Sequence, residues 1–205
     1  MFISFEGIDG SGKTTHAGLL AETLTNLKIG PLLVREPGGT AAGEHIRKLL
    51  LNRHFPISLK TEVLLYAAAR AQLLQEVIRP AMEAGRMVFC DRYIDSSLAY
   101  QGHGLGVDLD WIWELNHQIA EGIQPELTFL LDLPVEEAIT RRSGKADRIE
   151  QRDMEFYRRV RRGYLELAAR EPKRFAIIDA LWPVEKVQKA IWEQFRGRYP
   201  DLVNG

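Results

Sequence analysis

The sequence is poor in the residues from which disulfide frameworks and metal clusters are built. It contains one cysteine, Cys90, so no disulfide bond can form within the chain. Its five histidines do not have the spacing of metal ligands, and neither CxxC nor HExxH occurs. We therefore expect no disulfide-stapled secreted domain and no metal centre built from cysteine or histidine.

Long apolar segments and leader features are lacking too. No apolar run approaches the roughly 18 residues of a membrane helix. The first residues have no basic region of the kind that opens a signal peptide, and Glu6 and Asp9 interrupt the apolar stretch. Neither a repeat nor a low-complexity linker divides the chain. These absences predict a single cytoplasmic domain over residues 1–205 with no membrane partner.

Positive and negative charges are nearly balanced over the whole chain. The chain has 27 Lys and Arg against 28 Asp and Glu, so its net charge of −1 does not favour a nucleic-acid partner. Nine of the 27 basic residues, however, lie between positions 141 and 162, beside only four acidic ones. This local excess needs its own explanation.

Short β-branched and aromatic runs alternate with longer segments of helical periodicity. The runs predict strands at residues 1–5, 32–34, 87–90, 127–131 and 175–178. Several are almost continuously apolar, as in strands buried on both faces of a parallel sheet. A 3.6-residue period predicts helices at residues 17–27 and 61–78, the second with Pro80 near its end. The alternation predicts a three-layer α/β/α fold of the P-loop NTP hydrolase type, with a five-stranded parallel sheet flanked by helices.

The strongest motif follows the first predicted strand. It matches GxxxxGK[ST] and, with the next threonine, is Gly7-Ile8-Asp9-Gly10-Ser11-Gly12-Lys13-Thr14-Thr15. Glycines let the backbone curl so that its N–H groups point at phosphate oxygens, and the following helix N-terminus adds positive potential. Lys13 should reach the β- and γ-phosphates of a nucleoside triphosphate, and the Thr14 hydroxyl should ligate Mg²⁺. The pattern therefore predicts a site for ATP or GTP.

A phosphate loop also needs a carboxylate from another strand end to hold or orient the metal. Asp91 and Asp132 both follow predicted strands. Asp132 could instead cap the next helix, whereas Asp91 is followed by Arg92 and Tyr93, which supply phosphate-binding chemistry. We favour Asp91.

The phosphate loop alone does not separate kinases from GTPases, motors and scaffolds. The Asn-Lys-x-Asp pattern with which switch GTPases recognise guanine is absent. Further blocks resemble the bacterial form of the thymidylate kinase family, in family order and across nearly the whole chain. They are residues 5–15, Arg35-Glu36-Pro37-Gly38-Gly39-Thr40, residues 91–102, Asp147-Arg148-Ile149-Glu150 and Ile178-Asp179-Ala180.

Tyr66 and Arg70 are spaced i, i+4 and share one helix face. An aromatic ring beside a guanidinium suits a pyrimidine, since the ring stacks and the arginine donates to a carbonyl oxygen. The resemblance implies that this pair holds thymine, although the family more often has Phe at the position of Tyr66. Without that resemblance, an amphipathic core residue and a solvated charge would be the default interpretation.

The resemblance implies further contacts with dTMP. Arg92 and Arg47 would bind its phosphate, and Asp9 would meet the 3′-hydroxyl of the sugar. Arg47 could equally be a surface residue, and Asp9 could merely stabilise the turn.

The expected acceptor site is completed by three residues that follow the third predicted strand in the sequence. Ser97 and Gln101 share a helix face and would meet the thymine edge, though either could be a cap or a surface group. Tyr100 would lie under the deoxyribose, where a 2′-hydroxyl would collide, or else be a core aromatic residue.

The basic excess matches the family's lid, here residues 141–152. An arginine inserted at the transferring phosphoryl group stabilises its developing charge. The loop holds no arginine, so the lid has to supply one from Arg141, Arg142, Lys145 or Arg148; we favour Arg142 and Arg148. For the four arginines of the next helix we expect a solvated face.

Together these observations predict a thymidylate kinase that uses ATP and Mg²⁺, with Lys13, Asp91, Arg92, Arg142 and Arg148 as its catalytic residues. The resemblance also implies a homodimer. Two alternatives remain: a kinase for another pyrimidine nucleotide or a nucleoside, and a non-enzymatic nucleotide- or nucleic-acid-binding protein that uses the basic run. Salt-dependent binding of oligonucleotides without acceptor-dependent ATP consumption would identify the second.

Overall fold

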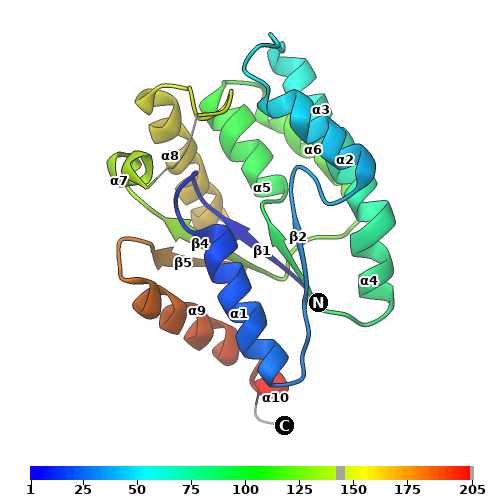
Figure 1. The fold of residues 1–205 in the computed structure, drawn as a ribbon, viewed down its shortest axis with the longest axis vertical. Coiled ribbons are helices and arrows are strands. Elements are labelled where there is room, and N and C mark those ends of the chain that lie inside the picture. Colours follow the sequence, from blue (N-terminus) through cyan, green and yellow to red (C-terminus); the bar gives the residue numbers. More distant parts are fainter. Residues whose placement is uncertain (142–145, 204–205) are drawn as a thin grey trace.

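The computed structural model describes residues 1–141 and 146–203, and its centre is a five-stranded parallel sheet (Figure 1). The strand order is β2-β3-β1-β4-β5. The strands are β1 (Phe2–Glu6), β2 (Leu32–Arg35), β3 (Val88–Asp91), β4 (Leu127–Asp132) and β5 (Phe175–Asp179). The five predicted strands are confirmed, and each ends one residue later than predicted, on a charged residue. The apolar run ends there, but the hydrogen-bonded ladder includes one residue more.

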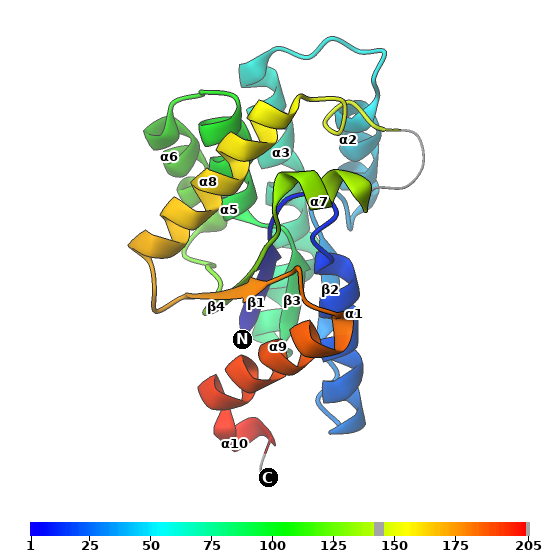
Figure 2. The ribbon, with the colours of Figure 1, turned by 90° about the vertical axis from the view of Figure 1, so that its left-hand side faces the viewer.

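Helices cover both faces of the sheet. α1 (Lys13–Asn26) and α9 (Val184–Arg198) pack together on one face. Figure 2 shows α8 (Met154–Arg170) and α9 on opposite sides of β5. The remaining helices are α2 (Ala41–Leu51), α3 (Leu59–Leu73), η1 (Leu74–Ile78), α4 (Arg79–Glu83), α5 (Ile94–Ser97), η2 (Leu98–Gly104), α6 (Leu109–Ala120), α7 (Val135–Thr140) and α10 (Pro200–Val203). No helix of the described ranges is long and apolar enough to cross a bilayer.

Side-chain caps begin two of the helices near the site, and a third helix continues past a proline. Thr40 accepts a hydrogen bond from Gly43 N–H (3.0 Å) at the start of α2, and Asp153 accepts one from Phe156 N–H (2.7 Å) at the start of α8. The helix after Ser58 continues past Pro80 as far as Glu83. It can do so because it widens into the π-helical turn η1, and Pro80 lies in the first turn of α4, where a backbone N–H is not needed.

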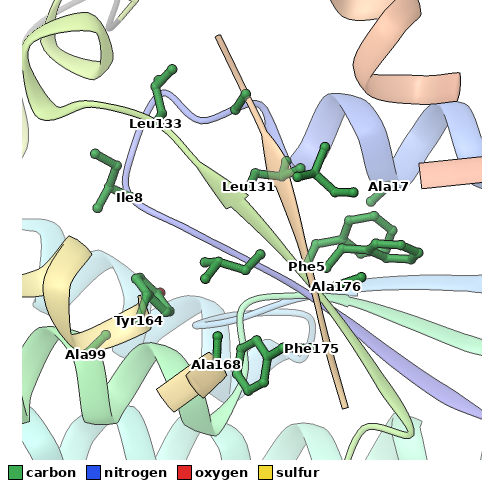
Figure 3. Close-up of a cluster of buried hydrophobic side chains, with 14 of the residues drawn as sticks. Phe5, Ile8, Ala17, Ala99, Leu131, Leu133, Tyr164, Ala168, Phe175 and Ala176 are labelled. Carbon is green, nitrogen blue, oxygen red and sulfur yellow. The ribbon is translucent and has the colours of Figure 1, made fainter. Parts of the chain in front are cut away.

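The core lies on both sides of the sheet, as Figure 3 shows for one cluster. Phe5 and Ala17 lie on the α1 side, whereas Tyr164 of α8 lies on the other. The ring of Phe5 is 5.6 Å from that of Phe89 and 5.2 Å from that of Phe129. One aromatic cluster therefore joins the three central strands directly beneath the phosphate loop.

Phe5→Ala should lower the free energy of unfolding by about 3–5 kcal/mol, because it leaves a cavity between two fixed aromatic rings. Denaturant unfolding measures this change. Phe55→Ala is the matched control, since Phe55 is 50% exposed and its loss should change stability by no more than about 0.5 kcal/mol. Equal effects of the two substitutions would contradict the central role of Phe5.

Candidate active site

The phosphate loop joins β1 to α1 through glycines with left-handed backbone angles. Gly7 has φ 139° and Gly10 has φ 89°. A Cβ added at Gly10 would lie 2.6 Å from the carbonyl oxygen of Ala138, so only glycine fits this turn. The curled loop leads directly into α1, whose first N–H groups lack helical acceptors and can face an anion.

Lys13 is buried at the base of this loop. It is 6% exposed, and its Nζ donates to the carbonyl oxygen of Ile8 (3.0 Å). Burial lowers the pKa of Lys13 from 10.5 to about 8, the positive charge of Arg92 adds to this, and the carboxylate of Asp91 opposes it. An incoming phosphate would favour the charged amine.

The two candidate metal carboxylates have different partners. The Thr14 hydroxyl donates to Asp91 Oδ2, so a hydroxyl and a carboxylate lie together beside the loop. Asp132 instead accepts two hydrogen bonds from Arg161 of α8, at 2.7 and 2.8 Å, and it does not cap α7. Within residues 1–141 and 146–203, no group of three or more His, Cys, Asp and Glu side chains could hold a metal ion. A metal here would take its other ligands from phosphate and water, as Mg²⁺ commonly does.

Arg92 follows β3 in a left-handed conformation, with φ 72°. Such a backbone costs about 1–3 kcal/mol for a residue with a bulky side chain, so its surroundings must hold it. Its Nη2 donates to Asp9 Oδ1 (2.5 Å) and to the Tyr100 hydroxyl (3.0 Å), and its Nη1 donates to the carbonyl oxygen of Gly7 (3.1 Å). The Tyr100 hydroxyl also donates to Asp9 Oδ2 (3.0 Å). Arg92 is thereby fixed against the phosphate loop.

Glu6, which the sequence did not identify as a site residue, lies behind Arg92. It is fully buried and accepts hydrogen bonds from Tyr93 N–H (2.7 Å), the Ser96 hydroxyl (2.6 Å) and the Tyr164 hydroxyl (3.0 Å). Both hydroxyls also accept from Arg92 Nη1. Burial, and then the charge of Asp95, raise the pKa of Glu6 to about 7. A carboxylate at a strand end was visible in the sequence, but its partner 158 residues away was not.

A pocket lies beyond Arg92. All eight residues expected to contact the acceptor line it: Asp9, Arg47, Tyr66, Arg70, Arg92, Ser97, Tyr100 and Gln101. The lining also includes residues that were not predicted, namely Glu36, Pro37, Leu51, Ser96, Asp147 and Ile149.

Arg70 is the most enclosed side chain of this pocket, only 1% exposed. Its guanidinium donates to Glu36 Oε2 (2.5 and 2.8 Å), to Ser97 Oγ (3.1 Å), to Asn116 and to the carbonyl oxygen of Tyr93 (3.0 Å). These bonds involve all five N–H groups of the guanidinium. A contact between Arg70 and a base carbonyl would therefore have to share or replace one of them.

The other expected acceptor residues have mixed environments. Arg47 is half-buried and donates to the carbonyl oxygen of Pro37 (3.0 Å), so it is not a free surface charge. Tyr100 lines the pocket and also packs edge-on against Phe156 and Tyr164, so it is both a core aromatic residue and part of the pocket wall.

Of the basic lid candidates, Arg142 and Lys145 lie outside the described residues. Arg141 lines the open hollow over the phosphate loop and donates to the carbonyl oxygen of Ala180 (2.9 Å). Arg148 lines neither hollow; it donates to the carbonyl oxygen of Leu50 (2.7 Å) and to Glu62 Oε2 (2.7 Å).

Of the four arginines expected to form a solvated face on α8, Arg158, Arg159 and Arg162 are exposed and Arg161 is half-buried, and each of the four also has a protein partner. Arg161 pairs with Asp132, Arg158 with Glu136 and Glu155, and Arg162 with Glu166. Arg159 donates to the carbonyl oxygen of Gly104. Sequence spacing cannot show this, since three of these acceptors lie on other elements.

The hollow over the phosphate loop adjoins the pocket beyond Arg92. The loop side is lined by Gly10, Gly12, Lys13, Thr14 and Thr15, together with Asp91 and Arg141. Asp9, Glu36, Arg47 and Arg92 line both hollows. Two carboxylates and two guanidiniums therefore stand where an anion in one hollow would meet an anion in the other.

Comparisons with known proteins agree with this geometry. The family model for thymidylate kinase matches residues 5–191. The thymidylate kinase of Kosmotoga olearia is 46% identical to this chain over 197 residues, which cover 95% of each chain. The thymidylate kinase of Pelotomaculum thermopropionicum is 51% identical over 183 residues, which cover 87% of this chain and 85% of that relative. The crystal structure of thymidylate kinase from Ehrlichia chaffeensis superimposes with a TM-score of 0.80 at 36% identity, covering 96% of this chain and 98% of that one. This chain belongs to the thymidylate kinase family.

Proposed function

We propose that this protein transfers the γ-phosphoryl group of ATP to the 5′-phosphate of dTMP, giving dTDP and ADP. The observation that carries the proposal is the meeting of the two hollows, which share the lining residues Asp9, Glu36, Arg47 and Arg92. Two phosphate groups brought together repel each other, and fixed guanidiniums between them offset that repulsion. Holding both substrates in line supplies most of the catalysis that phosphoryl transfer needs.

The donor side of the proposal rests on the phosphate loop, Lys13 and the oxygen pair of Thr14 and Asp91. Oxygen ligands of this kind suit Mg²⁺, and the proposed ion would neutralise charge on the phosphates of ATP. Lys13 would bind the β- and γ-phosphates from the floor of the loop. We also propose that Arg142 is the lid residue that inserts at the transferring phosphoryl group. This part of the proposal rests on the sequence pattern alone, because the placement of Arg142 is not described.

On the acceptor side, Tyr66 would stack on the base, Arg70, Ser97 and Gln101 would surround its polar edge, and Tyr100 would lie under the sugar. Arg158, Arg161 and Arg162 of α8 each pair with a carboxylate, which argues against a nucleic-acid surface there. By family membership we further propose a homodimer that works in the cytoplasm, where its nucleotide substrates are. Light scattering tests the dimer.

The test of this function is ADP formation from ATP-Mg with dTMP, dUMP, UMP, dCMP, dGMP and thymidine. We expect dTMP to be used best. The loss of the methyl group in dUMP should cost about 1–3 kcal/mol, so dUMP should remain a measurable substrate, while UMP and dCMP should be poor. Absence of dTMP-dependent ADP formation would refute the function, whereas equal use of UMP or dCMP would refute only the pocket assignment.

The pH dependence of ATP use tests the role of Lys13. The pKa of Lys13 is lowered to about 8, so in the free protein the charged amine is present below that pH and is lost above it. We expect kcat/KM for ATP to fall about tenfold per pH unit above 8, because this ratio reports the free enzyme. At saturating ATP, kcat should begin to fall only at higher pH, since bound phosphate favours the charged amine. A kcat/KM for ATP that stays constant from about pH 7.5 to 9.5 would contradict this role.

A further inference from the structure

Glu62, in the first turn of α3, is a buried carboxylate that no motif identified. It is 1% exposed and does not line the acceptor pocket. Its Oε2 accepts hydrogen bonds from Arg148 Nη1 (2.7 Å) and Arg152 Nη2 (2.9 Å). Its Oε1 accepts one from Gln101 Nε2 (3.0 Å). One carboxylate thus joins the C-terminal part of the lid segment, at Arg148 and Arg152, to a residue of the pocket wall.

These contacts determine which way the Gln101 amide faces. A carboxylate held by two guanidiniums can only accept hydrogen bonds, so only the N–H₂ end of the amide can face it. The reverse orientation would put two acceptor oxygens about 3 Å apart in a buried site and leave the N–H₂ group without this partner. Among the described residues, Glu62 is the hydrogen-bond partner of the Gln101 side chain. The amide oxygen, Oε1, is therefore the polar atom that Gln101 offers to the pocket.

We propose that Glu62 is a specificity-determining residue that acts through Gln101, by fixing its amide with the oxygen toward the acceptor base. This inference rests on the proposed function. Thymine and uracil carry an N–H donor at N3, which an acceptor oxygen satisfies. Cytosine has a lone pair at N3, which the same oxygen repels. The pocket thus rejects cytosine through a group that does not itself touch the base.

Glu62→Gln should reverse this arrangement. Arg148 and Arg152 require an oxygen on their side, so the new amide turns its N–H₂ group toward Gln101. Gln101 then has to offer its oxygen to residue 62 and its N–H₂ group to the base. The ratio of kcat/KM for dTMP to kcat/KM for dCMP should fall by at least about tenfold, because the pocket has exchanged an acceptor for a donor.

Two controls separate this effect from a loss of structure. Glu76→Gln removes a carboxylate of the exposed surface, where Glu76 accepts a bond from Gln72, and it should leave the ratio unchanged. In a Gln101→Leu background the ratio should no longer respond to Glu62→Gln. A fall in kcat/KM by the same factor for both nucleotides would show that Glu62 only anchors residues 147–152, and would overturn the proposal. Wild-type inactivity on dTMP would instead refute the proposed function.

If Glu62→Gln does not fold, the wild-type protein offers a second test. The side-chain N–H₂ protons of Gln101 should be protected from hydrogen exchange before any nucleotide is added, because they already bond to Glu62. Protection that appears only with bound dTMP would overturn the proposal.

Discussion

The ion pair between Arg92 and Asp9, with 2.5 Å between Nη2 and Oδ1, ties the end of β3 to the phosphate loop. Both side chains are largely withdrawn from solvent, so removing either partner would leave a poorly solvated charge at a cost of about 3–5 kcal/mol. The left-handed backbone of Arg92 persists because this pair and the Tyr100 hydroxyl hold its guanidinium. Held in this way, Arg92 forms part of the wall that the two hollows share.

The support behind Arg92 explains why a buried carboxylate stands at the end of β1. Glu6 orients the Ser96 and Tyr164 hydroxyls, and these hydroxyls present their oxygens to Arg92. Glu62 has a comparable place behind Gln101. In both cases a buried charge outside the pocket orients a neutral group that contacts the pocket or its arginine, which leaves the pocket surface rigid before a ligand enters.

The sheet was predictable because its strands are apolar runs bounded by polar residues. The phosphate loop was predictable because its turns require glycine, and this requirement is visible in the sequence as a motif. Ser97 and Gln101, whose spacing puts them on one helix face, both line the same pocket. Glu6, Glu36 and Glu62 were not found. Each is a carboxylate whose partners lie on other elements. Arg70 is 34 residues from Glu36, and Tyr164 is 158 residues from Glu6. Their burial follows from packing between elements, which local periodicity does not contain.

The arrangement of two anion sites around Arg92 is tested most directly by a crystal structure with dTMP, Mg²⁺ and a non-hydrolysable ATP analogue. The account predicts the dTMP phosphate within hydrogen-bond distance of the Arg92 guanidinium, the base against Tyr66 and the terminal phosphate of the analogue at Lys13. A dTMP phosphate out of reach of Arg92, or a base bound outside the pocket of Tyr66 and Gln101, would contradict it.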